Sequence, residues 1–94
     1  MQKPVDVTIV IPLLNEEESL LLLNDWIFKV FKSHSFNFEI IYIDDGSTDQ
    51  SWQNIRNLSI EYNNVRGVRF VKNFGKSQAL HAGFEIASGK YVIT

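Results

Sequence analysis

FEIIYIDDGSTD, residues 38–49, decides the fold of this chain. Its first half is an apolar, β-branched run of strand length, and its second half holds carboxylates, a glycine and helix-capping side chains. In an open α/β sheet, ligands bind beyond the carboxyl ends of the strands, so Asp44 and Asp45 stand where a ligand site is expected. A purely structural interpretation stays open at this point, in which the two aspartates form a turn and Ser47 caps the next helix.

Length and composition exclude several classes of protein. The chain has 94 residues, which allow one domain at most, and its 45% hydrophobic and 13% aromatic content is typical of a globular protein. The formal net charge is −2 and the basic residues are scattered, so no nucleic-acid partner is expected. The absence of cysteine excludes disulfides and thiolate metal sites. No apolar run reaches the ~20 residues of a membrane span.

On either side of the central stretch, the chain alternates strands and helices. Strands are predicted at residues 7–12, 38–44, 65–71 and 91–94, the third of them at a sheet edge because Gly67 and two arginines weaken it. Capping-box patterns predict helices that start at residues 15 and 47, and a third helix follows the loop at residues 73–77. The predicted fold class is α/β, an open, mostly parallel sheet with helices on both faces.

The first predicted helix has an apolar stripe with a spacing of three and four residues. This stripe is expected to lie on the sheet. Its members are Leu20, Leu23, Trp26, Ile27, Val30 and Phe31.

Three loops follow strands of the predicted parallel sheet and should meet at one rim. They supply Asn15, Glu16, Asp44, Asp45, Ser47, Asn73 and Lys76. This set, acceptors together with one cation, suits a ligand with hydrogen-bond donors at one end, such as a nucleobase and ribose, and phosphates at the other.

Spacing excludes two common phosphate-binding motifs. Gly75-Lys76-Ser77 is like the end of a phosphate-binding loop, but that loop needs a glycine where this chain has Phe70. A dinucleotide-binding fingerprint needs glycines after the first strand, where this chain has PLLNE at residues 12–16.

Three motifs, in order along the chain, resemble the start of a family 2 glycosyltransferase: VIPLLNEE at residues 10–17, IDDGSTD at 43–49 and VKNFGKSQALHAG at 71–83. More narrowly, they are similar to the dolichol- or polyprenyl-phosphate sugar transferase branch. The resemblance implies the Rossmann-like GT-A fold of nucleotide-diphospho-sugar transferases. Residues 1–94 would then be its N-terminal, nucleotide-sugar-binding part, incomplete because the chain ends in the fourth strand.

The resemblance also implies roles for individual residues. It places Pro12, Asn15 and Glu16 around the nucleotide, Asp44 on the base, Asp45 and Ser47 beside the ribose and loop, and Lys76 near ribose or phosphate. Leu14 departs from the aromatic residue that family members commonly have there. The implied Asp-x-Asp motif for Mg²⁺ or Mn²⁺ and any catalytic base would lie beyond Thr94, so residues 1–94 are expected to hold no catalytic residue and no metal.

The implied reaction is inverting transfer of a sugar from a UDP-sugar or a GDP-sugar such as GDP-mannose to an acceptor, a polyprenyl phosphate in the branch named above. The 94 residues alone are expected to be inactive. Two other functions stay open: a phosphotransfer or receiver-like domain that uses Asp44 and Asp45 with Mg²⁺, and a non-catalytic binding module.

The expected partners are a nucleotide-sugar donor and a lipid-phosphate acceptor, with membrane contact only through segments outside these residues. The expected location is the cytoplasm or the cytoplasmic face of a membrane. An unfinished sheet leaves a strand edge and apolar helix faces exposed, so self-association is expected as well.

Overall fold

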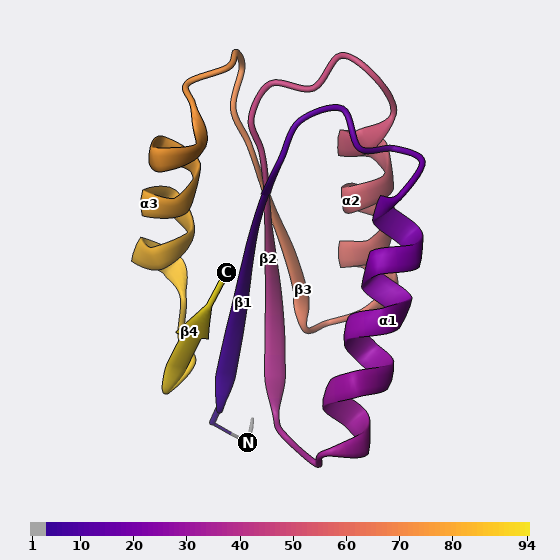
Figure 1. Cartoon of the computed structure of the whole chain (residues 1–94), viewed down its shortest axis with the longest axis vertical. Coiled ribbons are helices and arrows are strands. Elements are labelled where there is room, and N and C mark those ends of the chain that lie inside the picture. Colours follow the sequence, from indigo (N-terminus) through magenta and orange to yellow (C-terminus); the bar gives the residue numbers. More distant parts are fainter. Residues whose placement is uncertain (1–3) are drawn as a thin grey trace.

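A computed structural model describes residues 4–94 as a four-stranded sheet with helices on both faces (Figure 1). The strands are β1 (Val7–Leu13), β2 (Phe38–Asp44), β3 (Val65–Arg69) and β4 (Tyr91–Ile93), and the helices are α1 (Leu20–Ser33), α2 (Ser51–Glu61) and α3 (Lys76–Ile86). The strand order is β3-β2-β1-β4, and each neighbouring pair is parallel. The predicted α/β fold class is confirmed, and β3 lies at an edge of the sheet, as predicted.

The core has two layers because successive side chains of a strand point to opposite faces of the sheet. On one face, Ile40 and Tyr42 of β2 pack in the larger cluster, together with side chains of α1 and α2. On the other face, Ile41 and Ile43 pack with Ala79 of α3. All seven residues of β2 are buried, so the near-continuous apolar run of this strand reflects helices on both sides.

The helices α1 and α2 begin later than predicted. The capping-box patterns placed their starts at residues 15 and 47, whereas α1 begins at Leu20 and α2 at Ser51. The Glu17 carboxylate accepts the Gln50 N–H at 3.1 Å, and one Asp49 oxygen accepts the Glu17 N–H at 3.2 Å. The predicted capping acceptors, Asn15 and Ser47, likewise bond between the two loops, so neither caps a helix of its own segment.

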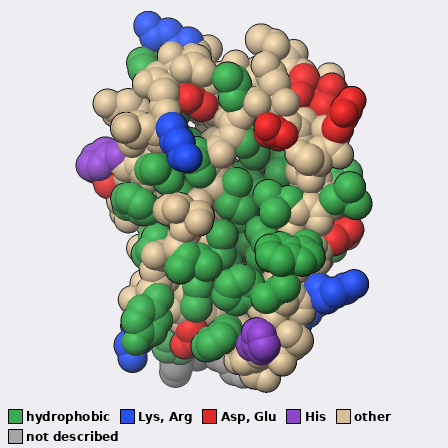
Figure 2. Space-filling view, viewed as in Figure 1, with side chains coloured by type: hydrophobic (Ala, Val, Ile, Leu, Met, Phe, Trp, Pro, Cys, Tyr) green, Lys and Arg blue, Asp and Glu red, His purple; other side chains and the backbone are tan. Residues whose placement is uncertain are grey.

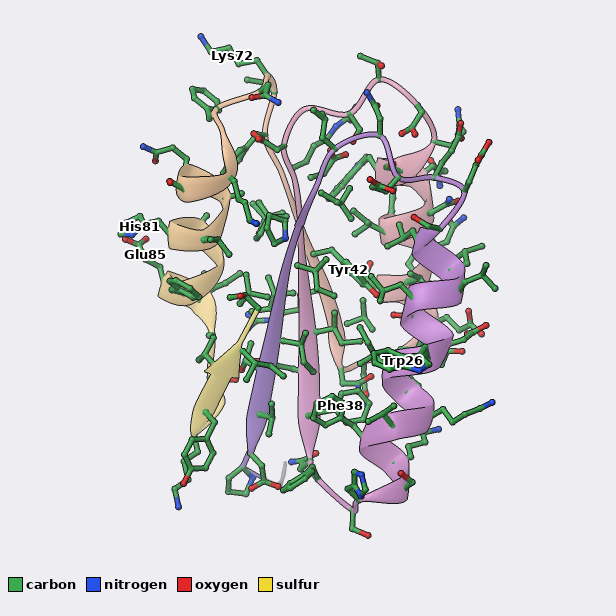
Figure 3. All side chains as sticks on the ribbon, in the orientation of Figure 1. Trp26, Phe38, Tyr42, Lys72, His81 and Glu85 are labelled. Atoms are coloured by element: carbon green, nitrogen blue, oxygen red, sulfur yellow. The ribbon has the colours of Figure 1, made fainter. Side chains whose placement is uncertain are left out.

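The buried face of α1 is rotated relative to the predicted stripe. Trp26 is 63% exposed and Leu23 is also exposed, whereas Asn24 is buried. Asn24 Oδ1 accepts the hydroxyl hydrogen of Tyr42 at 2.7 Å, and Figure 3 shows Tyr42 between the sheet and the helices. Leu20 and Ile27 are buried as predicted. The buried face of α1 thus includes a polar pair with β2 beside its apolar residues.

Apolar side chains gather on the face between α1 and β4 in Figure 2. β4 pairs only with Val7–Ile9, so within residues 4–94 the rest of β1 has no neighbouring strand on that side. Val92 and Ile93 of β4 are exposed. The expected open strand edge is confirmed, while self-association stays a prediction. No helix in the described part of the chain combines the length and the apolar character needed to cross a membrane.

Candidate functional site

The loops that follow β1, β2 and β3 lie together at the carboxyl ends of the strands, at the top of Figure 1. The Asp45 N–H donates to the Leu13 carbonyl at 2.9 Å, which joins the first two loops. At Gly46, the backbone has a φ of +90°, and an added Cβ would lie 2.6 Å from the carbonyl carbon of Lys72. The second and third loops are therefore packed backbone against backbone.

A pocket of about 320 Å³ opens at this rim. The six residues that line it are Pro12, Leu13, Leu14, Glu16, Asp45 and Lys76. It combines an apolar wall with two carboxylates and one ammonium group. This chemistry suits a ligand that has a flat apolar part, hydrogen-bond donors and an anionic part. Four of the predicted site residues, Pro12, Glu16, Asp45 and Lys76, are brought together here.

Asp45 contributes a carboxylate that is fixed in direction. Its side chain is only 6% exposed. Oδ1 accepts the Phe74 N–H at 2.8 Å, and Oδ2 accepts the Gly75 N–H at 3.0 Å. Each carboxylate oxygen has a further lone pair, so Asp45 can still accept a hydrogen bond from a ligand.

Asp44 does not line this pocket. Its side chain is 0% exposed, and Oδ1 accepts the Ser47 N–H at 2.8 Å. Oδ2 has no hydrogen-bond partner among residues 4–94. Asp44 therefore stabilises the turn after β2, and a base could reach it only after that turn moved. Its assignment to the base stays a prediction.

Asn15 and Ser47 hold two loops together. Asn15 Oδ1 accepts the N–H groups of Thr48 at 2.9 Å and Asp49 at 3.3 Å, and the Asn15 N–H donates to Ser47 Oγ at 2.8 Å. Neither residue lines the pocket, and their predicted nucleotide contacts stay predictions. Asn15 also has a φ of +54°, a conformation that asparagine tolerates better than most residues. We call these hydrogen bonds of Asn15 with Ser47, Thr48 and Asp49 the interloop clamp. The clamp was not predicted, because a sequence does not show from which distant N–H groups an asparagine side chain will accept hydrogen bonds.

We expect Asn15→Ala to lower the free energy of unfolding by about 2 kcal/mol, because it removes the acceptor and places an alanine at positive φ. Asn15→Gly removes only the acceptor, so its expected cost is about 1 kcal/mol. Urea denaturation followed by tryptophan fluorescence measures both values. An Asn15→Ala protein as stable as the parent chain would contradict the clamp.

A second groove, of about 620 Å³, lies at the opposite end of the strands, beside Glu39 and Arg66. Glu39 accepts hydrogen bonds from the Thr8 hydroxyl at 2.6 Å, from the Ser88 N–H and hydroxyl at 2.8 Å each, and from Arg66 at 3.0 Å. Burial raises the pKa of Glu39, but these hydrogen bonds and the Arg66 charge outweigh it and leave the pKa below its ordinary value. The Glu39 carboxylate therefore links β1, β3 and the segment before β4 at this end of the sheet.

Sequence comparison identifies relatives along almost the whole chain. The sequence model of glycosyl transferase family 2 matches residues 8–94. Undecaprenyl-phosphate 4-deoxy-4-formamido-L-arabinose transferase of Aeromonas hydrophila is 43% identical over 89 residues, which are 94% of this chain and 27% of that protein. Dodecaprenyl-phosphate galacturonate synthase of Rhizobium johnstonii is 33% identical over 91 residues, or 96% of this chain and 27% of that protein.

Bactoprenol glucosyl transferase of Shigella phage SfV is 34% identical over 87 residues, which cover 93% of this chain and 28% of that protein. The chain therefore spans about a quarter of the length of these curated relatives. Their names agree with the branch that the three sequence motifs resemble. With the parallel α/β sheet and the family match over residues 8–94, the resemblance is confirmed, and the chain belongs to glycosyl transferase family 2.

Proposed function

We propose that this chain forms the nucleotide-binding part of a glycosyltransferase that moves a sugar from a nucleotide-sugar donor to a polyprenyl phosphate. Membership of the family and relatives named for undecaprenyl and dodecaprenyl phosphate support the reaction class. One structural observation carries the site: the rim pocket brings Glu16, Asp45 and Lys76 together at the carboxyl ends of the strands.

In this proposal, the nucleoside lies against the apolar wall of Pro12 and Leu14, with its N–H and hydroxyl donors toward Asp45 and Glu16. The carboxylates favour a ligand with donors, because an acceptor group placed against either of them would be repelled. The diphosphate lies toward Lys76, the first residue of α3, where the ammonium group and the positive helix end both favour an anion. UDP-sugars and GDP-sugars both meet these requirements, because each base carries a ring N–H.

The remaining parts of the reaction are assigned to a longer protein. A polyprenyl phosphate is already an anionic nucleophile and needs little help from a base. Mg²⁺ or Mn²⁺ would neutralise the leaving diphosphate. Residues 4–94 contain no group of three His, Cys, Asp or Glu side chains able to hold a metal. With a lipid acceptor, the enzyme would work at the cytoplasmic face of a membrane.

Titration of the ¹⁵N-labelled chain with UDP and GDP tests the nucleotide site. We expect amide shifts at the pocket residues Leu14, Glu16, Asp45 and Lys76.

Lys76→Met should weaken UDP binding about tenfold, because it removes the cation nearest the phosphates. Lys29→Met is the matched control: Lys29 is exposed on α1, and its loss should change affinity by less than about twofold because the charge is distant and screened.

Two outcomes would contradict the proposal. The first is the absence of shifts at the rim with either nucleotide. The second is a response of Asp44 and Asp45 to beryllofluoride with Mg²⁺ and none to nucleotides, which would favour a phosphotransfer domain. If Lys76→Met and Lys29→Met change the affinity for UDP equally, Lys76 does not contact the phosphates.

A further inference from the structure

The Asp45 carboxylate has two neighbours of different kinds. It forms part of the pocket wall, beside Glu16 and Lys76. It also accepts the backbone N–H groups of Phe74 at 2.8 Å and Gly75 at 3.0 Å, one with each oxygen. A group that faces a ligand on one side thus holds the β3–α3 loop, residues 70–75, on the other.

The β3–α3 loop is held by this contact at the end that leads into α3, and by backbone packing on Gly46 in its middle. Residues 71–74 are exposed, and Val71 is 94% exposed. Gly75 has a φ of +101°, and an added Cβ there would meet no atom within 4 Å. Among residues 4–94, Asp45 accepts both hydrogen bonds that tie the amides of residues 71–75 to the rest of the rim.

Lys76 follows this anchored segment directly. It is the first residue of α3 and lines the pocket, and its side chain is exposed. Gly75, the N-cap residue of α3, has no side chain of its own to cap the helix. The anchored residue Gly75 therefore lies directly before Lys76, at the start of a helix that packs on the sheet through Ala79. No salt bridge joins Asp45 and Lys76 within the described residues, so the link between them runs through the backbone.

We propose that Asp45 is a positioning residue for Lys76, in addition to any contact that it makes with a ligand. By holding the Phe74 and Gly75 amides, it keeps the Lys76 ammonium group at the distance from the pocket wall that a nucleoside diphosphate requires. Recognition at the nucleoside end and at the phosphate end of the pocket is then coupled. This inference rests on the proposed nucleotide site. It adds a tether to that site, namely the two hydrogen bonds that Asp45 accepts from the Phe74 and Gly75 N–H groups.

A double-mutant cycle on UDP binding measures this coupling. Asp45→Asn keeps the side-chain volume but replaces one acceptor oxygen with an amide group that faces a backbone N–H. If Asp45 positions Lys76, then Lys76→Met should weaken UDP binding about tenfold in the parent chain and less than about twofold in the Asp45→Asn background. If Asp45 only contacts the ligand, Lys76→Met costs the same factor in both backgrounds, and the inference is overturned.

Amide hydrogen exchange without any ligand tests the tether separately. Asp45→Asn should accelerate exchange of the Phe74 and Gly75 amides at least about tenfold, while Lys76→Met leaves both rates unchanged. Unchanged rates in Asp45→Asn would overturn the tether. If the parent chain fails to bind UDP, the proposed function and the coupling fall together, whereas the exchange rates still decide whether Asp45 holds the loop.

Asp49→Asn is the matched control. Asp49 also accepts two backbone N–H groups, those of Ser51 at 2.8 Å and Glu17 at 3.2 Å, but in the other two loops. This variant should leave the tenfold effect of Lys76→Met unchanged. If Asp45→Asn does not fold, Asp45→Glu carries the same cycle, because its longer side chain keeps the charge but shifts both acceptor oxygens. Loss of coupling in Asp49→Asn as well would show a general loosening of the rim and refute a specific role of Asp45.

Discussion

Gly46→Ala is expected to lower the free energy of unfolding by about 3 kcal/mol and to separate the second rim loop from the third. Gly46 has a φ of +90°, where a Cβ is strained in any surroundings. The added Cβ would also lie 2.6 Å from the carbonyl carbon of Lys72 and 2.7 Å from the backbone nitrogen of Asn73. Both atoms are backbone, so a change of rotamer cannot relieve the clash and one loop has to move.

Gly75→Ala provides the matched control for this prediction. Gly75 has a similar φ of +101°, but its Cβ would meet nothing within 4 Å. Its ψ of +159° completes a conformation that is nearly restricted to glycine, so alanine there adds conformational strain without a clash, at an expected cost of about 2 kcal/mol. Urea denaturation of both variants isolates the packing between the loops as their difference. Equal losses of stability would show that the close approach at Gly46 contributes nothing.

Glu39→Ala is expected to lower the free energy of unfolding by about 3 kcal/mol, because it removes a buried carboxylate that accepts four hydrogen bonds, one of them from the fully buried Thr8 hydroxyl. Its carboxylate joins Thr8 of β1 to Ser88, which lies just before β4, and pairs with Arg66 of β3. Arg66 is partly exposed, with 45% of its side chain accessible, so the loss of the ion pair itself contributes little. Most of the cost comes from the hydroxyl and amide groups of Thr8 and Ser88.

Two comparisons sharpen the Glu39 prediction. Glu39→Gln keeps one acceptor oxygen, so its stability should fall between those of the parent chain and Glu39→Ala. The exposed Glu18→Ala should change stability by less than about 0.5 kcal/mol.

Since the pKa of Glu39 is lowered in the folded state, its contribution to stability is present above the ordinary pKa of 4.5 and is lost as the pH falls through the lower folded value. The stability gap between parent and Glu39→Ala should therefore shrink on acidification below pH 4.5. A gap that widens instead would contradict the assignment.

The strands and their order of appearance could be predicted from sequence because they rest on local patterns. β2 is a run of apolar, β-branched residues that ends in carboxylates, and a strand buried on both faces requires such a run. The exposed edge of β3 followed from Gly67 and its two arginines. The grouping of the loops at one rim follows from parallel strands alone, and the structure brings Pro12, Glu16, Asp45 and Lys76 to that rim.

The helix starts were predicted too early because a capping box describes a bond within one segment. The acceptors at these positions bond to another segment instead, as when Asn15 Oδ1 accepts the Thr48 N–H 33 residues away. The buried face of α1 was predicted only in part. Apolar spacing favoured Leu23 and Trp26, which are exposed, and it did not include Asn24, which is buried and accepts the Tyr42 hydroxyl hydrogen. Hydrophobic periodicity carries no information about such a pair.

By itself, the sequence determined the parallel α/β sheet, the family, and the carboxyl ends of the strands as the place of the site. Only the tertiary structure decided that Asp45 and not Asp44 lines the pocket, and that Asn15 holds a loop. The physical reason is that neighbouring residues at a strand end point to opposite faces of the sheet, and the packing of distant loops then determines which face stays open.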